Sequence, residues 1–329
     1  MSVSAVPVKA PTASRGRWAR RHAWTLSVYV LFVILLIAEK IIHPDLNAFD
    51  LQSLVNGALP LALAAMAQAV VVLSGGIDLS VGAMMSLMNV ASALLIANTD
   101  LKGALLMGVL LMGAAAVAGA FTGVLITVSG VPDIIVTLGM SFVWAGLALQ
   151  LMPTPGGGAP QGFVDLLTGT IGPSVPSGLL VLLAALVVIW LPFRRSRSGL
   201  AVYAIGSNRT AAFLSGVSVA RTRVIAYALG AAFAALAGLV LTANTSNGSA
   251  LSGNIYTLNS VAAIVLGGVS LTGGRGGMIG PLAAAFVLTL ITALLTFLGV
   301  DPNYGQVIQG TLIVLVVMFG GLVLVRRRA

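Results

Sequence analysis

Residues that could do chemistry are few in this chain of 329 residues, and their spacing argues against catalysis. No Lys follows a Gly anywhere, so the chain lacks the Walker A loop that holds the phosphates of ATP. His22 and His43 flank an apolar run about as long as one membrane span, so they cannot bind one metal ion together. The sequence shows no nucleophile–base constellation of the kind that a hydrolase needs. We therefore expect no catalytic residue, no metal site and no cofactor bound by this chain.

Three uncharged polar residues stand inside apolar segments, where they could line a transport pathway: Gln68, Asn89 and Asn244. Lone polar residues in a helix bundle also often serve only to bridge neighbouring helices. Carriers driven by an ion gradient usually bury carboxylates inside the bundle. Here no apolar segment carries an Asp or Glu near its middle, and Asp78 and Asp133 lie at segment edges. Coupling to an ion gradient is therefore weakly supported.

The composition defines the class of elements that must position these residues. Hydrophobic residues make up 58% of the chain, charged residues 8%, and the mean hydropathy is +1.07. A soluble domain contains about 25% charged residues, which it needs to cover its surface. This composition excludes a cytosolic enzyme, a disordered chain and a nucleic-acid-binding module. The long Ala/Leu/Val/Gly runs lack the period of two of a β-barrel, so we expect an all-α, polytopic transmembrane bundle.

Ten membrane spans can be placed by length and hydropathy. We expect a tail over 1–23, a transmembrane domain over 24–325 with an internal loop at 194–220, and a second tail over 326–329. The fourth span is long enough to tilt or bend near Gly119 and Gly123. The spans are expected at 24–42, 54–73, 79–98, 103–128, 133–151, 178–193, 221–243, 257–271, 278–299 and 304–325.

The basic residues set the orientation of this arrangement. If the N-terminus is cytoplasmic, all of the 17 Lys and Arg except Lys40 and Lys102 lie on the inner side. This asymmetry is what the positive-inside rule requires, and it favours an even number of spans with both termini in the cytoplasm. Six of the acidic residues then lie outside: Glu39, Asp45, Asp50, Asp100, Asp165 and Asp301.

Two glycine-rich strings stand between predicted spans. In the first, Gly75 and Gly76 allow a tight reversal, and Asp78 or Ser80 is placed to cap the helix that contains Gly82. A tight turn between helices, with no further role, would give the same string. The second string resembles the first with a one-residue gap, which hints at an internal repeat, and it continues into a glycine-rich stretch typical of a broken helix or re-entrant turn. Its glycines are Gly267, Gly268, Gly273 and Gly274.

A third string lies in the internal loop. Asn208 is a plausible N-cap for a short helix that ends near Leu214 and is closed by Gly216. The adjacent Ala211 and Ala212 would let this helix pack closely in a groove of a partner protein. A solvated helix in a loop would show the same sequence pattern.

These strings together resemble the permease subunits of sugar-type ABC importers, the family of ribose, xylose and autoinducer-2 permeases. The resemblance lies in Gly-Gly-Ile-Asp-Leu-Ser-Val-Gly at 75–82, the Gly-x-Asn-x-x-Ala-Ala-x-x-Ser-Gly-Val string at 206–217 and the glycine string at 267–276. A smaller likeness covers 131–139, where Asp133 replaces the aromatic or small residue usual in the family. The resemblance extends over about residues 50–320.

The resemblance implies a type II ABC importer fold with separate motor subunits. Two permease chains, identical or different, would form the pore in the bacterial inner membrane, with lipid around them. A cytoplasmic ABC ATPase would bind ATP and Mg, and a periplasmic sugar-binding protein would dock over 152–177 and 244–256. The segment that meets the ATPase would include Gly206, Asn208, Ala211, Ala212, Ser215 and Gly216. The chain itself would be no enzyme.

The substrate implied by the resemblance is a monosaccharide such as a pentose or hexose. Two other functions remain open at this stage: a branched-chain amino-acid ABC permease, and a secondary carrier that works without ATP.

Overall fold

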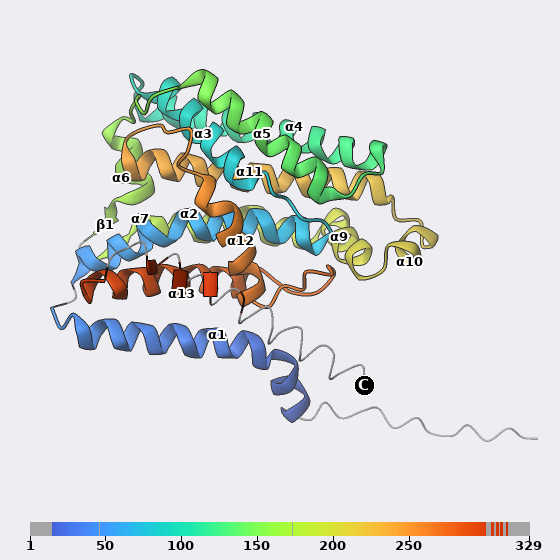
Figure 1. Cartoon of the computed structure of the whole chain (residues 1–329), viewed down its shortest axis with the longest axis horizontal. Coiled ribbons are helices and arrows are strands. Elements are labelled where there is room, and N and C mark those ends of the chain that lie inside the picture. The colour runs from blue at the N-terminus through green and yellow to red at the C-terminus, as the bar shows by residue number, and fades with distance from the viewer. Residues whose placement is uncertain are drawn as a thin grey trace, which may run out of the picture.

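Helices make up most of the chain in the computed structural model, which describes residues 15–45, 47–172 and 174–300, with 304, 305, 307, 308, 310, 311 and 314 (Figure 1). The first half contains α1 (Arg15–Ile42), α2 (Ala48–Leu73), α3 (Val81–Ile96), α4 (Leu101–Ser129), α5 (Asp133–Leu151) and α6 (Gln161–Thr168). A two-stranded antiparallel sheet of β1 (Thr170–Ile171) and β2 (Val175–Pro176) follows. The second half contains α7 (Ser177–Ala184), the π-helix η1 (Ala185–Trp190), α8 (Leu191–Arg195), α9 (Arg197–Ser207), α10 (Arg209–Leu214), α11 (Val219–Thr245), α12 (Asn254–Leu266) and α13 (Ile279–Phe297).

The expected spans one to nine each correspond to a helix or, for the sixth, to the continuous segment α7–η1–α8. Among the described residues, six helical segments are long and apolar enough to cross a bilayer, and α3 and α12 are shorter apolar helices. The eighth span was expected to reach residue 271, but α12 ends at Leu266 because the backbone turns at Gly267 and Gly268. The tenth expected span, 304–325, lies mostly outside the described residues. The same holds for the greater part of the expected tail 1–23 and for the whole of the expected tail 326–329. The count of about ten therefore stays a prediction.

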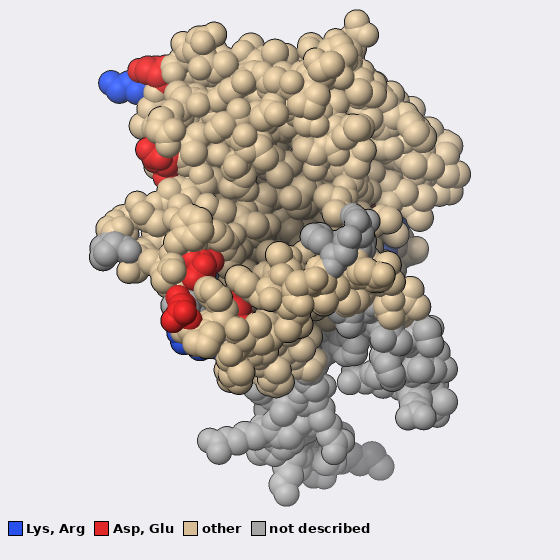
Figure 2. Space-filling view, turned by 60° about the vertical axis from the view of Figure 1, so that its left-hand side comes forward, with Lys and Arg blue, Asp and Glu red and all other residues tan. Residues whose placement is uncertain are grey.

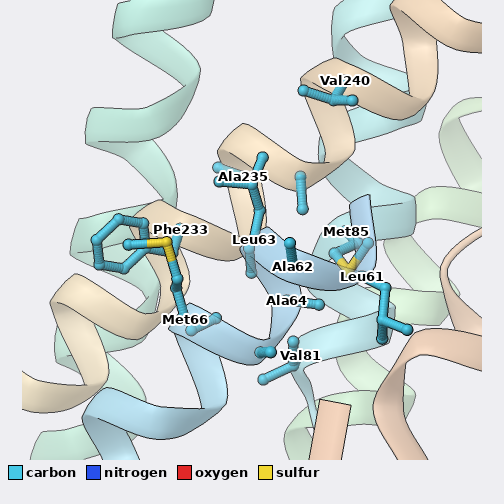
Figure 3. Close-up of a cluster of buried hydrophobic side chains, with 14 of the residues drawn as sticks. Leu61, Ala62, Leu63, Ala64, Met66, Val81, Met85, Phe233, Ala235 and Val240 are labelled. Carbon is cyan, nitrogen blue, oxygen red and sulfur yellow. The ribbon is translucent and has the colours of Figure 1, made fainter. Parts of the chain in front are cut away.

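The core of the bundle is built around α2. Every residue from Ala58 to Leu73 is buried, which a helix with small residues on all sides permits because neighbouring helices can approach closely. Figure 3 shows side chains from α2, α3 and α11 packed together at this centre, with Met66 beside Phe233. A helix that is apolar all round is buried in protein or surrounded by lipid, and α2 is of the first kind.

The α4–α11 contact depends on glycine. A Cβ on Gly119 would overlap the backbone oxygen of Tyr227, and one on Gly123 would lie 2.8 Å from the Cα of Val224. These positions therefore allow close helix packing rather than a bend, since α4 continues unbroken through both. On their other sides, α4 and α5 expose large apolar side chains, as lipid-facing helices do.

Charges separate to the two ends of the bundle. The end that carries α6 and β1 holds Asp45, Asp50, Asp100 and Asp165, and Figure 2 shows acidic side chains gathered on this face. The opposite end carries α9, α10 and the arginine-rich segment 194–223 (Figure 1). This separation is the pattern that the positive-inside rule describes, and the assignment of the arginine-rich end to the cytoplasm stays a prediction.

Candidate functional site

The three glycine strings meet at one place, at the arginine-rich end of the bundle. The amide of Gly274 donates a hydrogen bond to the carbonyl of Leu73 over 3.0 Å. A Cβ on Gly206 would overlap that same carbonyl oxygen, and one on Gly273 would lie 2.9 Å from the Cα of Gly75. We call the contact among Leu73–Gly76, Gly206–Ser207 and Gly273–Gly274 the glycine junction. Only residues without side chains allow three backbones to approach this closely.

Polar side chains of α9 complete the glycine junction. The hydroxyl of Tyr203 donates to the carbonyl of Gly276 over 3.2 Å, and the hydroxyl of Ser207 donates to the carbonyl of Gly274 over 3.4 Å. Burial raises the pKa of the Tyr203 hydroxyl, an effect that the nearby charge of Arg194 partly opposes. The phenol therefore stays protonated and keeps its donor role at neutral pH.

The short helix α10 follows directly after the glycine junction. The side chain of Asn208 accepts a hydrogen bond from the amide of Ala211 over 2.9 Å, which confirms the expected N-cap. Gly216 has a φ of 83° and closes the segment, as the sequence predicts. Ala212 is buried, whereas Phe213 and Leu214 are 67% and 79% exposed. This pair is the large apolar part of the exposed surface of α10, and the sequence reasoning missed it.

The loop between α2 and α3 is held by its own polar residues. Ser80 occupies the N-cap position of α3 but makes no capping hydrogen bond through its side chain, so the expected cap is wrong for this residue. Instead the carboxylate of Asp78 accepts from the amide and the hydroxyl of Ser80, over 2.7 and 2.6 Å. This is an Asx turn that fixes the loop before the helix begins. Burial raises the pKa of the Asp78 carboxyl, and the two hydrogen bonds oppose that rise.

Two other glycines of this first string permit close approaches. A Cβ on Gly76 would lie 2.6 Å from the carboxylate of Asp133 and 2.8 Å from the hydroxyl of Tyr227. A Cβ on Gly82 would overlap the carbonyl of Gly253 just before α12. The string therefore contacts α5, α11 and the start of α12 as well as making a turn.

The ends of α2 and α12 have the same geometry. Gly75 and Gly268 have φ values of 83° and 82°, and each donates its amide to a helix carbonyl three residues back. The following amide, of Gly76 or Val269, reaches five residues back in both cases, as in a Schellman motif. The two strings thus correspond from Leu73 and Leu266 onward without the gap that the sequence comparison required.

A buried ion pair of Arg223 and Asp133 lies beside the first string, and the sequence analysis counted Arg223 only among the basic residues of the inner side. Arg223 on α11 is 6% exposed and pairs with Asp133 at the first residue of α5. The hydroxyl of Tyr227 donates to the same carboxylate over 2.9 Å. One signal in the sequence could have indicated this site. Arg223 and Tyr227 are four residues apart, so they lie on the same face of a helix.

The three pathway candidates lie in different surroundings. Gln68 is fully buried in α2, and neither its amide nitrogen nor its amide oxygen has a hydrogen-bond partner among the described residues. Asn89 donates to Thr242 and accepts from the amide of Ser249, so it fastens α3 to the end of α11. Asn244 is exposed and donates to the carbonyl of Asn56 over 2.9 Å. The structure does not bring the three together at one site.

The two segments expected to dock a partner outside do meet. Gly156 and Gly248 exchange backbone hydrogen bonds of 3.1 and 2.8 Å, which join the 152–160 loop to the 246–253 loop. Elsewhere in the described parts of the chain, no three His, Asp or Glu side chains gather in a way that would hold a metal ion.

A bundle of long apolar helices with charge gathered at its ends and broken-helix glycine loops at one of them is the architecture of a multi-pass membrane permease. A family model described as "Branched-chain amino acid transport system / permease component" matches residues 51–317. The chain therefore belongs to this family of ABC transporter permeases, and it is a multi-pass membrane protein.

Curated relatives match over nearly the whole chain. It is 34% identical to the ribose import permease protein RbsC of Bacillus subtilis (strain 168) over 300 residues, which is 89% of this chain and 90% of that protein. It is 31% identical to the ribose import permease protein RbsC of Escherichia coli (strain K12), with 92% and 96% covered. It is 30% identical to the fructose import permease protein FruG of Bifidobacterium longum (strain NCC 2705), with 96% of each covered. No solved structure matches the chain.

Proposed function

We propose that this chain is the membrane-spanning permease subunit of an ATP-driven importer that carries a monosaccharide, a pentose or hexose, across the bacterial inner membrane. The observation that carries the proposal is the glycine junction, in which the loops that end α2 and α12 both contact the end of α9, directly before α10. A movement imposed on α10 from outside the membrane would reach both loops through backbone contacts. The relatives named as ribose and fructose import permeases support a sugar over a branched-chain amino acid.

The partner at α10 is a cytoplasmic ABC ATPase, which binds ATP and Mg. A short helix outside the membrane that exposes Phe213 and Leu214 is suited to an apolar groove, since exposed large apolar side chains mark protein contacts. Arg209 and Arg221 flank this pair and place positive charge around it. The bounds of α10 are set by Asn208 as its N-cap and by Gly216 after its end, and Gly206 lies just before it in the glycine junction. On the helix itself, Ala212 is buried and Ala211 is exposed, and Ser215, directly after it, is exposed too.

The other partners contact the remaining surfaces. A periplasmic sugar-binding protein docks on the joined 152–160 and 246–253 loops, at the acidic end of the bundle. A second permease chain and lipid cover the exposed apolar faces. The sugar passes along the interface between the two permease chains, where Gln68, Asn89 and Asn244 remain candidates for contact with its hydroxyl groups.

Affinity purification of the tagged chain in mild detergent tests the ATPase partner. We expect an ATPase with a Walker A loop to co-purify at about one per permease, and ATP hydrolysis that the matching binding protein stimulates. Uptake of labelled ribose or fructose should stop with vanadate and continue with a protonophore. A chain that purifies alone, while a known importer stays intact, would favour the secondary carrier.

A pair of variants tests the surface on α10. Leu214→Asp places a charge at a site that the proposal makes the centre of the ATPase contact, so co-purification of the ATPase should be lost. Leu251→Asp makes the same change at a leucine that is 64% exposed in the 246–253 loop at the other end, and the ATPase should remain bound. Loss of the ATPase in both variants, or in neither, would contradict the assignment of α10.

A further inference from the structure

The buried ion pair of Arg223 and Asp133 connects two helices that otherwise barely touch. α5 packs on α3 and α4, and α11 packs on α4, α2 and α3, whereas α5 and α11 have no extended contact with each other. At the arginine-rich end, the carboxylate of Asp133 receives both the guanidinium of Arg223 and the hydroxyl of Tyr227. We call these three residues the α5–α11 link.

The α5–α11 link leaves the guanidinium with one main counter-charge. Arg223 is 6% exposed, and its Nε has no hydrogen-bond partner among the described residues. Asp78 interacts electrostatically with Asp133, and its own carboxylate is already engaged by Ser80. The position of α5 relative to α11 is therefore tied to the Asp133 carboxylate, because separating the two charges inside protein is costly.

The start of α5 is fixed by few other polar contacts. Pro132 stands at its N-cap and makes no capping hydrogen bond. Thr137 contacts the α2–α3 loop, where its hydroxyl accepts from the amide of Leu79 over 3.1 Å and donates to the carbonyl of Ile77 over 3.3 Å. The first two turns of α5 are thus attached to α11 through Asp133 and to the α2–α3 loop through Thr137.

The other end of the α5–α11 link lies next to α10 in the chain. α10 ends at Leu214, α11 begins at Val219, and Arg223 stands one turn further on. The side chain of Ser218 accepts from the amide of Arg221, which caps α11 at this point. A displacement of α10 would therefore move the first three turns of α11, and Arg223 and Tyr227 with them.

We propose that the α5–α11 link transmits the movement of α10 to α5, with Arg223 and Asp133 as positioning residues for transport. The proposal rests on the proposed function, because it needs an ATPase acting on α10. A buried ion pair contributes little net stability compared with a neutral pair of similar shape, so its contribution here is the coupling of two helices. It also gives Asp133, where this chain departs from the usual family pattern, a partner on α11.

A double-mutant cycle separates transmission from a structural role. Asp133→Asn and Arg223→Gln each leave a buried charge without its partner, so each alone should lower the thermal stability of the complex. The double variant removes both charges and should recover most of that stability. Sugar imported per ATP hydrolysed should nevertheless fall about tenfold, as for loss of a coupling of ordinary size. Arg223→Lys should retain part of this ratio, and Arg195→Gln, at an exposed arginine of α8, should leave it unchanged.

A double variant with wild-type stability and a wild-type transport ratio would overturn the proposal. Failure of the wild-type complex to couple uptake to ATP would instead contradict the proposed function. The two failures are therefore distinguishable.

A labelling measurement tests the same proposal without using uptake. The chain has no Cys, so an Ile134→Cys variant would present one thiol, next to Asp133 at a position that is 46% exposed. In the assembled complex, its rate of reaction with a maleimide should change when ATP and vanadate are added. Adding Asp133→Asn and Arg223→Gln should abolish that change while ATP hydrolysis continues. Persistence of the full change would overturn the proposal.

Discussion

Replacement of Gly206 by Ala tests the glycine junction with a single methyl group. An added Cβ would overlap the carbonyl oxygen of Leu73 and lie 2.5 Å from the amide nitrogen of Gly274. Both atoms belong to backbone, so no side chain can rotate to make room. α9 must move away from the ends of α2 and α12, and the hydrogen bond from Gly274 to Leu73 stretches or breaks.

The magnitude follows from opposing effects. Crowding in a packed interior costs about 1–3 kcal/mol. A hydrogen bond lost at a buried carbonyl costs about 1–3 kcal/mol more. Because Gly206 is helical, Ala gives back about 0.5–1 kcal/mol of backbone entropy. The clash therefore outweighs the entropic gain, and Gly206→Ala should lower stability by about 1–5 kcal/mol.

Thermal unfolding in mild detergent measures this effect. The matched control is Gly146→Ala in α5, because a Cβ there meets nothing within 4 Å and the helix gains entropy. The midpoint temperature of unfolding should fall for Gly206→Ala and stay unchanged or rise for Gly146→Ala. In the assembled importer, Gly206→Ala should also lower the sugar imported per ATP. Equal midpoints for the two variants would refute the close backbone approach that defines the glycine junction.

Three further sets of substitutions can be tested by the same measurement, the midpoint of thermal unfolding in mild detergent. Asn89→Ala removes a buried amide that holds α3 to α11 and should cost about 1–3 kcal/mol, whereas Asn244→Ala, at an exposed site, should stay within about 0.5 kcal/mol; equal losses would contradict this. Gly119→Leu should destabilise the chain by overlap with α11, and Gly113→Leu, where a Cβ meets nothing within 4 Å on the same helix, should not. Asp78→Asn keeps an oxygen that accepts both hydrogen bonds. Burial raises the pKa of Asp78 in the folded chain. The wild type should therefore lose stability relative to Asp78→Asn as pH rises above the ordinary carboxyl pKa. A stability difference between the two proteins that is the same at every pH would contradict this expectation.

Helix positions could be predicted closely from local signals. α5 begins and ends where expected, at 133 and 151, because Gly130 and Pro132 interrupt the preceding helix and fix its start. The N-cap at Asn208 was predicted from one residue type and confirmed by its hydrogen bond. Such signals are short-range, so they are visible in the sequence itself.

Contacts between distant segments could not be predicted in this way. The strings around Gly75, Gly206 and Gly273 each indicate a turn, but no periodicity shows that the three turns share one point. Arg223 was counted with the other basic residues of the inner side because the positive-inside rule counts charge by position along the chain and carries no information on burial. The inward face of Ala212 was equally hidden, since a helix of 6 residues is too short to show a periodic pattern.

The residue types at the glycine junction agree with a mechanical role. A side chain between two backbones can change rotamer and absorb a small displacement, whereas carbonyl and Cα atoms in direct contact cannot. Contact among Leu73, Gly206 and Gly273 therefore passes a movement of α9 and α10 to two loops with little loss. The α5–α11 link adds a third route, through charge, to α5, which the glycine junction approaches at Gly76. Contact at both places lets one short helix act on α2, α12 and α5 together, which a change of access across the whole bundle requires.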